Sequence, residues 1–213
     1  ADYLETVLTD KPVAWWAFDE SSGLIAADQV GDLKGNYVGV VSRRGVRGFA
    51  ANVAGPAAGR IQMMLDEQQD ARIERVLNGS FSLELWLLDE AAAPNGKTNY
   101  SLIYKADSKA FTSNSMWLYR ARQDGRYFFS IHDSQDRKIQ LATPNPAGKA
   151  AGDGKWHHVA VVIDRNEDKR QAIAYLDGEE VDRSRLEDGI AIDNDGSLIV
   201  GSNFHRNSPW VGA

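Results

Sequence analysis

The sequence predicts an all-β protein built from two packed antiparallel sheets, a jelly-roll sandwich. Seven Asn-Gly or Asp-Gly pairs are distributed along its 213 residues, and such pairs are the strongest short-range signal of a hairpin turn. Residues 156–164 are mostly β-branched and aromatic, a composition typical of a strand rather than a helix. Patterns with the helical period of 3.6 residues are scarce. The seven pairs are Asn78-Gly79, Asn95-Gly96, Asp124-Gly125, Asp153-Gly154, Asp177-Gly178, Asp188-Gly189 and Asp195-Gly196.

The predicted helices and strands lie between these predicted turns. Asp2 and Glu5 are spaced to cap one short helix before Leu8, and residues 70–77 form a second helical turn that Asn78-Gly79 ends. The segment 144–154 is rich in Gly, Ala and Pro, and we interpret it as a loop because predicted strands flank it. The predicted strands are 13–18, 36–41, 60–65, 80–88, 100–105, 115–121, 126–132, 137–142, 155–164, 170–176, 179–183 and 197–201.

The strand predicted at 80–88 carries apolar residues on both of its faces. Successive side chains of a strand point to opposite sides. Phe81, Leu83, Leu85 and Leu87 therefore share one side, and Ser82, Glu84, Trp86 and Leu88 share the other. A strand in a simple sandwich hides only one face. The second apolar face predicts either a concave outer surface that holds a ligand or loops that fold over it.

The composition excludes several classes of protein. The absence of cysteine rules out a disulfide framework but does not fix the cellular compartment. A net charge of −6 argues against a nucleic-acid partner, which requires a basic face. No apolar run is long enough for membrane insertion. The start of the chain lacks the basic and apolar regions of a signal peptide, so we expect a processed exported protein or a domain of a longer one.

Five segments, in order, resemble the laminin-G-like domains of the concanavalin A-like lectin/glucanase superfamily. Residues 156–160 read Trp-His-His-Val-Ala, 175–178 read Tyr-Leu-Asp-Gly, and 198–201 read Leu-Ile-Val-Gly. Upstream, residues 12–23 resemble the family's opening strand and loop, and 80–86 resemble its "SFTVEAW" strand. The resemblance covers residues 12–212 and implies one domain over 1–213. Because the family pattern continues with one more strand, that last strand is expected to be missing after Ala213.

The resemblance also raises the possibility of glycan cleavage. Glucanases of the superfamily carry a Glu-x-Asp-x-x-Glu strand, whose two catalytic carboxylates lie about 5 Å apart on one face. In this chain Glu84 and Glu90 share a face, but Trp86 stands where the middle acid belongs. We therefore predict that Glu84 is a paired or solvated residue and that the protein is not an enzyme.

A polysaccharide lyase is a second catalytic alternative. Ile131-His132 and the segment 183–187 superficially resemble two strands of jelly-roll alginate lyases, but their order is reversed and the tyrosine strand is absent. A lone histidine needs a positioned partner to act as a base. A serine nucleophile elbow, a phosphate-binding loop, a dinucleotide fingerprint and zinc spacing are also absent from the sequence. A glycan-processing enzyme remains a minor alternative.

Calcium is the cofactor that the sequence predicts, in a structural role. Acidic and amide residues crowd the first turns, and calcium prefers six to eight oxygen ligands from carboxylates and carbonyls. The resemblance implies a calcium site in this region, for which Asp19, Asp28 and Asn36 are the predicted ligands. The alternative is that these residues form solvated turns.

The predicted function is that of a non-catalytic, lectin-like binding module of an exported, bacterial-type protein, belonging to a larger multidomain chain. Its location would be extracellular, periplasmic or at the cell surface. Carbohydrate is the predicted ligand; the alternative is a protein-adhesion or structural domain that binds a cell-surface protein. Trp117 and Tyr119 share one side of their strand, where they can stack on a sugar while Arg122 and His132 bind its hydroxyls. Alternatively, both rings point into the core.

Overall fold

The structure is a computed structural model that describes residues 3–54, 59–90, 99–106, 114–146, 148, 151–203 and 210–213. The turn predicted at Asn95-Gly96 and the cap predicted at Asp2 lie outside these residues. In chain order the elements are α1 (Tyr3–Thr9), β1 (Ile25–Ala26), β2 (Gly35–Val38), β3 (Val41–Arg44), β4 (Phe49–Asn52), β5 (Arg60–Met63), α2 (Glu67–Leu77), β6 (Phe81–Leu88), β7 (Tyr100–Ala106), β8 (Ser115–Arg120), β9 (Tyr127–His132), β10 (Lys138–Ala142), β11 (Trp156–Asp164), β12 (Gln171–Leu176), β13 (Glu179–Arg185) and β14 (Leu198–Val200).

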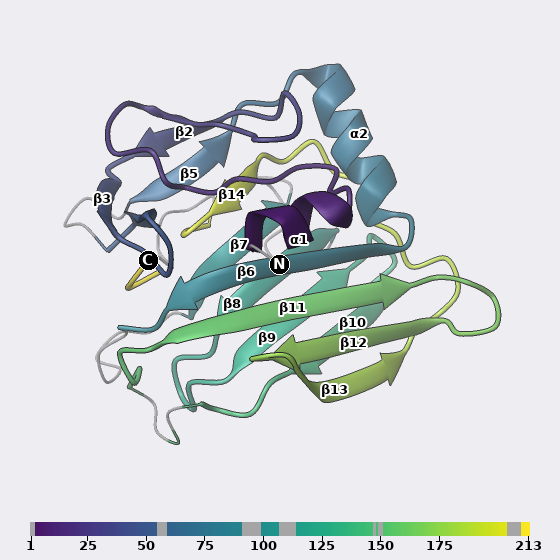
Figure 1. Ribbon diagram of the computed structural model, residues 1–213. Coiled ribbons are helices and arrows are strands. Elements are labelled where there is room, and N and C mark those ends of the chain that lie inside the picture. Colours follow the sequence, from purple (N-terminus) through teal and green to yellow (C-terminus); the bar gives the residue numbers. More distant parts are fainter. Residues whose placement is uncertain are drawn as a thin grey trace.

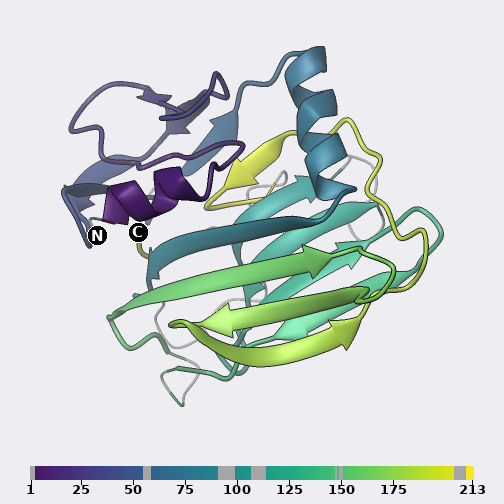
Figure 2. The same cartoon turned by 45° about the vertical axis from the view of Figure 1, so that its right-hand side comes forward.

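Two antiparallel sheets face each other and enclose the hydrophobic core (Figure 1). The larger sheet has eight strands in the order β1-β2-β5-β14-β7-β8-β9-β10, and the smaller has four in the order β13-β12-β11-β6. Figure 2 shows the four-stranded sheet as a separate layer in front of β7 to β10. A further hairpin pairs β3 with β4. The predicted all-β sandwich of two antiparallel sheets is therefore confirmed.

Helix α2 begins earlier than the predicted turn at 70–77. Asp66 and Gln69 form a capping box: the Asp66 carboxylate accepts the Gln69 backbone N–H at 2.8 Å, and the Gln69 side chain accepts the Asp66 N–H at 3.0 Å. The predicted end is confirmed, because the Asn78 N–H donates back to Glu74 at the last turn. The helix lies at one end of the sandwich (Figure 1). Neither helix in the described part of the chain has the length and apolar character needed to cross a membrane.

The strand predicted at 13–18 is wrong. This segment makes a single isolated bridge, between Trp16 and Asp28. Phe18 has a left-handed backbone with φ of 54°, which a strand cannot accommodate. Trp16 is fixed instead through its indole N–H, which donates to the Leu33 carbonyl at 2.6 Å.

The strand predicted at 36–41 is two strands, β2 and β3. Gly39 separates them with a positive φ of 64°, a conformation that glycine adopts without strain. The short strands β1 and β4 were not predicted.

The hairpin predicted at Asp177-Gly178 is confirmed. Both residues have positive φ, 53° and 86°, as a two-residue type I′ turn requires. The turn joins β12 to β13 directly. It also brings Asp177 next to His157, at the start of β11.

His157 is a buried clamp between two carboxylates. Its Nδ1 lies 2.9 Å from Asp177 Oδ2 and its Nε2 lies 3.2 Å from Asp153 Oδ1. Burial favours the neutral ring, but the two hydrogen bonds outweigh it and raise the pKa of His157 above its ordinary value. Burial opposes the charged carboxylates as well, but hydrogen bonds from the backbone and from His157 lower the pKa of both aspartates. The clamp holds the β12–β13 turn against the loop that precedes β11.

We expect this clamp to stabilise the fold between mildly acidic and neutral pH. A raised histidine pKa gives stability that is fully present below the unfolded value of about 6.5 and is lost as pH rises through the folded value. The aspartate contribution is present above about pH 3.9 and is lost as pH falls through their lowered values. Melting temperatures of the wild type and His157→Gln should therefore converge on going from pH 6 towards pH 9. A difference between the two melting temperatures that stays constant with pH would contradict the stabilising role of the charged His157.

A buried ion pair joins the two sheets inside the sandwich. Asp89, directly after β6, and Arg120 of β8 are both fully buried, and Arg120 Nε donates to Asp89 Oδ2 at 2.7 Å. The Tyr127 hydroxyl of β9 donates to the same oxygen at 2.8 Å. Burial and the Asp89 charge raise the pKa of Tyr127, so its hydroxyl remains a donor.

Arg120→Leu should lower the free energy of unfolding by about 3–5 kcal/mol, because Asp89 would remain as a buried charge without its cation. Tyr127→Phe, the matched control, removes a single hydrogen bond to the same carboxylate and should cost about 2 kcal/mol. Urea denaturation measures both values. A cost for Arg120→Leu no larger than that of Tyr127→Phe would argue against the pair as the main link between the sheets.

Candidate ligand-binding site

The two aromatic residues predicted to bind ligand lie on the outer face of the eight-stranded sheet. Met116 and Leu118 of β8 point into the core, and Trp117 and Tyr119 alternate with them. The prediction that both rings share one side is confirmed, and the alternative that they point into the core is wrong. Both rings are partly buried, because they belong to a row of stacked side chains.

The rings of this row stack against one another. Trp117 lies 4.2 Å from Tyr119, and Tyr119 lies 5.3 Å from Phe128, centroid to centroid. The rings of Tyr104 and Trp117 meet edge to face with their centroids 6.1 Å apart, and the Arg126 guanidinium lies 4.8 Å from the Phe128 centroid at the other end. These neighbours take up ring faces that a sugar would need, so the row is better suited to stabilising the sheet.

The polar groups of the row also have partners. The Trp117 indole N–H donates to Ser101 Oγ at 2.9 Å, and Gln140 Nε2 donates to the Tyr119 hydroxyl at 3.0 Å. Arg122 follows the end of β8, whereas His132 lies opposite Ser115 at the beginning of that strand. The two are therefore separated by the length of β8, about 20 Å. The structure brings Trp117 and Tyr119 together but not Arg122 and His132.

The three predicted calcium ligands do not form one shared cage of oxygen atoms. Asp28 Oδ1 accepts the N–H groups of Trp15 and Val30 at 3.0 and 3.1 Å, and Oδ2 accepts that of Leu33 at 3.2 Å. Asp28 thus organises its own turn with both oxygens. Asp19 is exposed, and Asn36 lies within β2. In the described ranges no three His, Cys, Asp or Glu side chains are grouped to hold a metal. The residues do not fit calcium as they lie, and calcium stays a prediction.

Asp28→Ala should lower the free energy of unfolding by about 2 kcal/mol or more, because three backbone N–H groups lose a charged acceptor. The loss should be the same in EDTA and in millimolar calcium, as measured by calorimetric melting. A rise of the wild-type melting temperature with calcium that Asp28→Ala abolishes would instead assign calcium to this turn.

A second aromatic surface lies on the outer face of the four-stranded sheet. Leu83, Leu85 and Leu87 of β6 pack towards the core, so Glu84 and Trp86 point outwards. His158 of β11 is the cross-strand partner of Trp86. Helix α1 lies beside β6 in both views (Figures 1 and 2) and brings Tyr3 close to Glu84 and Trp86. We refer to Tyr3, Glu84, Trp86 and His158 as the Trp86 patch.

The geometry of the Trp86 patch leaves an aromatic ring accessible beside polar groups. Trp86 is 40% exposed, and its ring centroid lies 5.1 Å from that of His158. His158 Nε2 lies 3.3 Å from Glu84 Oε2. The hydrogen bond from His158 lowers the pKa of Glu84, so this carboxylate is charged at neutral pH. The patch thus offers an apolar ring surface, an acceptor and an imidazole within one small area.

The sequence pointed to Trp86 and Glu84 but missed His158 and Tyr3. Outward-facing Trp86 agrees with the prediction of a second apolar face on this strand. The prediction that Glu84 is paired or solvated is confirmed, because it is both hydrogen-bonded to His158 and half exposed. The cross-strand register that places His158 opposite Trp86, and the packing of α1 beside β6, have no signal in the local sequence.

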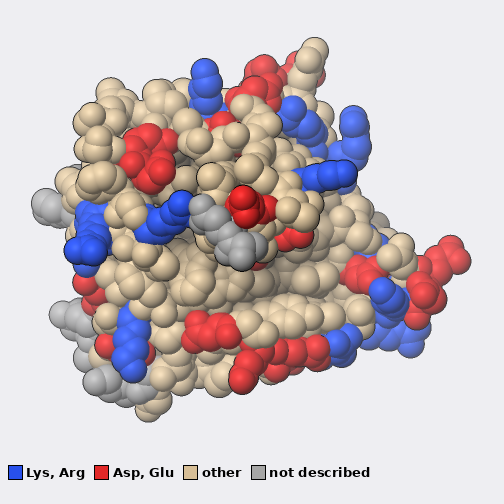
Figure 3. Space-filling model, viewed as in Figure 1, with Lys and Arg blue, Asp and Glu red and all other residues tan. Residues whose placement is uncertain are grey.

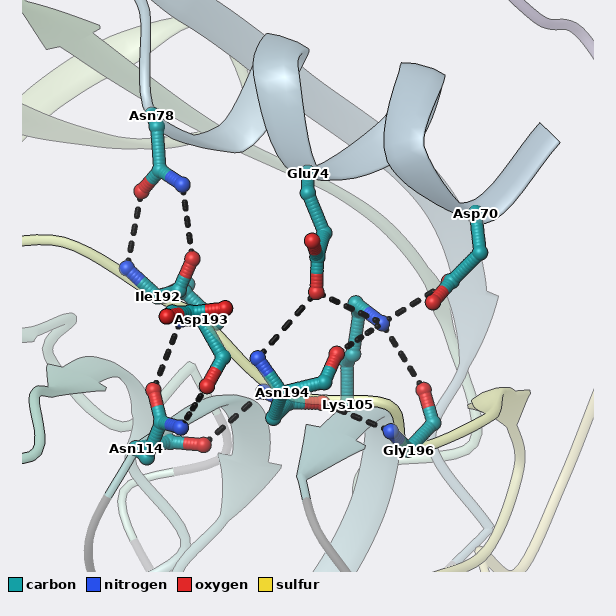
Figure 4. Close-up of polar contacts among 9 residues, drawn as sticks. All are labelled: Asp70, Glu74, Asn78, Lys105, Asn114, Ile192, Asp193, Asn194 and Gly196. Atoms are coloured by element: carbon teal, nitrogen blue, oxygen red, sulfur yellow. Dashed lines mark hydrogen bonds and ion pairs between the residues drawn. The ribbon is translucent and has the colours of Figure 1, made fainter. Parts of the chain in front are cut away.

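A third polar cluster, around Lys105 of β7, is a closed structural link (Figure 4). The fully buried Lys105 ammonium donates to Asp70 Oδ1 at 2.9 Å and to the carbonyls of Asn194 and Gly196 at 3.2 and 2.8 Å. These three acceptors match its three N–H donors. Glu74 adds a second carboxylate at 3.8 Å.

The same segment is tied to helix α2 by further contacts. Asn78 exchanges two hydrogen bonds with the backbone of Ile192, and Glu74 Oε1 accepts the Asn194 N–H at 3.1 Å (Figure 4). A cavity of about 450 Å³ borders this cluster and is lined mainly by acidic residues of α2 and of the segment 193–197. Because the contacts around Lys105 are satisfied within the chain, the cluster fixes α2 to the sheet.

Comparison with known proteins gives the same fold. The family model of the concanavalin A-like lectin/glucanases superfamily matches residues 65–213, more than half of the chain. The comparison with curated protein sequences found no match. The binding domain of Paraclostridial Mosquitocidal Protein 1 has a TM-score of 0.64 at 15% identity, covering 91% of this chain and 46% of that chain.

Two further solved structures are similar. The CBM40 of the Ruminococcus gnavus IT-sialidase, bound to alpha2,3 sialyllactose, has a TM-score of 0.52 at 16% identity, covering 71% of this chain and 80% of its own. A structure of botulinum neurotoxin type C, whose cell entry is described as dependent upon interaction with two ganglioside molecules, has a TM-score of 0.65 at 14% identity, covering 88% and 42%. The chain spans less than half of the two toxin chains. At these identities the likeness shows the fold alone.

Proposed function

Because the chain belongs to the concanavalin A-like lectin/glucanases superfamily, we propose that it is a non-catalytic, lectin-like module that binds carbohydrate at the Trp86 patch. The observation that carries this proposal is the exposed indole of Trp86 beside the hydrogen-bonded Glu84 and His158. Sugar rings present apolar C–H faces that pack on an aromatic ring, and their hydroxyls need nearby acceptors and donors. The patch supplies both.

The make-up of the patch favours binding over cleavage. Glycoside hydrolysis needs two carboxyl groups that flank the scissile bond. Glu84 has His158 as its hydrogen-bond partner, and the position two residues further along β6 is Trp86 rather than an acid. A glycan bound here would therefore be released unchanged.

The relatives add support for a carbohydrate ligand. One is described as bound to sialyllactose and another as dependent on gangliosides. Those ligands belong to those proteins, and the toxin chains extend well beyond the matched part. We further propose that the module acts outside the cytoplasm, in the extracellular space, the periplasm or at the cell surface, within a larger chain. Adhesion to a cell-surface protein is the alternative.

Trp86→Ala should weaken glycan binding at least about tenfold, which corresponds to about 1.4 kcal/mol of lost stacking. A glycan array identifies the ligand, and isothermal titration calorimetry with that glycan measures the affinity. Because the Trp86 side chain lies outside the core, the melting temperature should change little.

Two variants serve as controls in the same titration. Phe49→Ala removes another exposed aromatic ring, 46% exposed on β4, and should leave the affinity unchanged. Trp117→Ala removes a ring from the stacked row and should lower stability but not affinity. Loss of binding in Trp117→Ala with full binding in Trp86→Ala would move the site to the opposite sheet. A folded wild type that binds no glycan, but binds a surface protein, would favour the adhesion alternative.

A further inference from the structure

We infer that the Trp86 patch selects neutral or amino sugars and rejects sugars that carry a carboxylate, such as sialic and uronic acids, with Glu84 as the residue that sets this preference. This inference rests on the proposed function, since it concerns the chemistry of the ligand at the same site.

Glu84 places an accessible negative charge where a ligand would stack. Its side chain is 52% exposed, compared with 20% for that of His158, so a bound sugar meets the carboxylate directly. Bringing a second carboxylate beside it would strip water from two like charges, and this is unfavourable without a compensating cation. An ammonium group in the same position would gain an ion pair.

The patch holds no surplus positive charge to offset Glu84. His158 is its only ionisable cation, and its ring nitrogen is already paired with Glu84 at 3.3 Å. Whether His158 is protonated or neutral, the net charge of the pair is zero or −1. Tyr3 adds no cation, and burial together with the charge of Glu84 raises the pKa of its hydroxyl.

Two basic residues, one in the four-stranded sheet and one in the loop before β11, lie close to acids. Arg183 of β13 makes two hydrogen bonds to Glu180, at 2.9 and 2.6 Å. The charge of Lys155, which precedes β11, helps to lower the pKa of Asp153. Helix α1 has an acid in its first turn and no basic residue in its last turn. A carboxylated sugar that approached either of these two cations would compete with its acidic neighbour.

The charge of the surrounding face also disfavours carboxylated sugars. In Figure 3 acidic side chains gather along the edge of this face, over β13, whereas the basic groups at that level lie towards its two ends. The long-range field over the four-stranded sheet therefore favours cationic or neutral ligands during approach as well as in contact.

The test is a glycan array that contains matched pairs differing by one charged group, including lactose against sialyllactose and β1,4-linked glucose, glucosamine and glucuronate oligomers. Wild-type protein should bind neutral or amino members at least about tenfold more tightly than their carboxylated counterparts.

Glu84→Gln keeps the hydrogen-bonding shape and removes the charge. This variant should bind amino sugars at least about fivefold more weakly than the wild type and should lose less affinity for neutral sugars. The affinity difference between neutral and carboxylated glycans should become smaller. Glu167→Gln, in the exposed loop between β11 and β12 and outside the patch, is the matched control and should leave the ranking unchanged.

The outcomes separate the inference from the proposed function. Tight binding of sialylated or uronic glycans that is lost in Trp86→Ala would overturn the inference and leave the proposed function standing. If Glu84→Gln left the order of glycan affinities unchanged, Glu84 would not be the residue that sets the preference, and the inference would also be overturned. Binding that survives Trp86→Ala, or no binding to any glycan, would overturn both.

Discussion

The buried carboxylate of Asp89 is the constraint on which the arrangement of the two sheets depends. Its side chain accepts from Arg120 and Tyr127 of the eight-stranded sheet, while its own backbone extends the four-stranded sheet. The Asp89 N–H donates to Lys155, and its carbonyl accepts the N–H of Gly154. A charge buried between two layers is tolerated only when donors surround it, so the sheets can approach at this end only in the register that supplies those donors. Gly152 belongs to the same arrangement, because a Cβ there would lie 2.3 Å from Asp89 Oδ1.

The opposite end of the sandwich is held by a different charge. Lys105 reaches from β7 to helix α2 and to the segment before β14, and all of its donors are satisfied. The buried polar links at the two ends leave the core between the sheets to aliphatic and aromatic packing. The outer faces of the two sheets differ in how their aromatic rings pack. On the larger sheet the aromatic rings stack on one another and stiffen the strands, whereas on the smaller sheet Trp86 has His158 beside it and remains accessible.

Elements with a strong local signal were predictable from the sequence. The alternation along β11 and the Asp177-Gly178 turn fix strand, turn and strand through backbone geometry that involves a few neighbouring residues. Elements that depend on partners far along the chain were not predictable in the same way. The segment 13–18 has strand composition, but it is fixed by a tryptophan hydrogen bond to residue 33 and interrupted by the left-handed Phe18. The acidic first turns predict a calcium site, and local composition could not show that Asp28 accepts backbone N–H groups with both of its oxygens.

The sequence by itself determined that this chain forms a two-sheet antiparallel sandwich, and that Glu84 and Trp86 share a face of one strand, because a strand alternates with a period of two residues. Only the tertiary structure decided what those faces meet. Whether an aromatic ring is stacked or accessible depends on cross-strand register and on the packing of separate elements. Register sets Tyr119 against Phe128 in one sheet and Trp86 against His158 in the other. The position of α1 adds Tyr3 to the second pair. Trp86 and His158 lie 72 positions apart and Tyr3 and Trp86 lie 83 apart, so no local pattern encodes the contacts of the Trp86 patch.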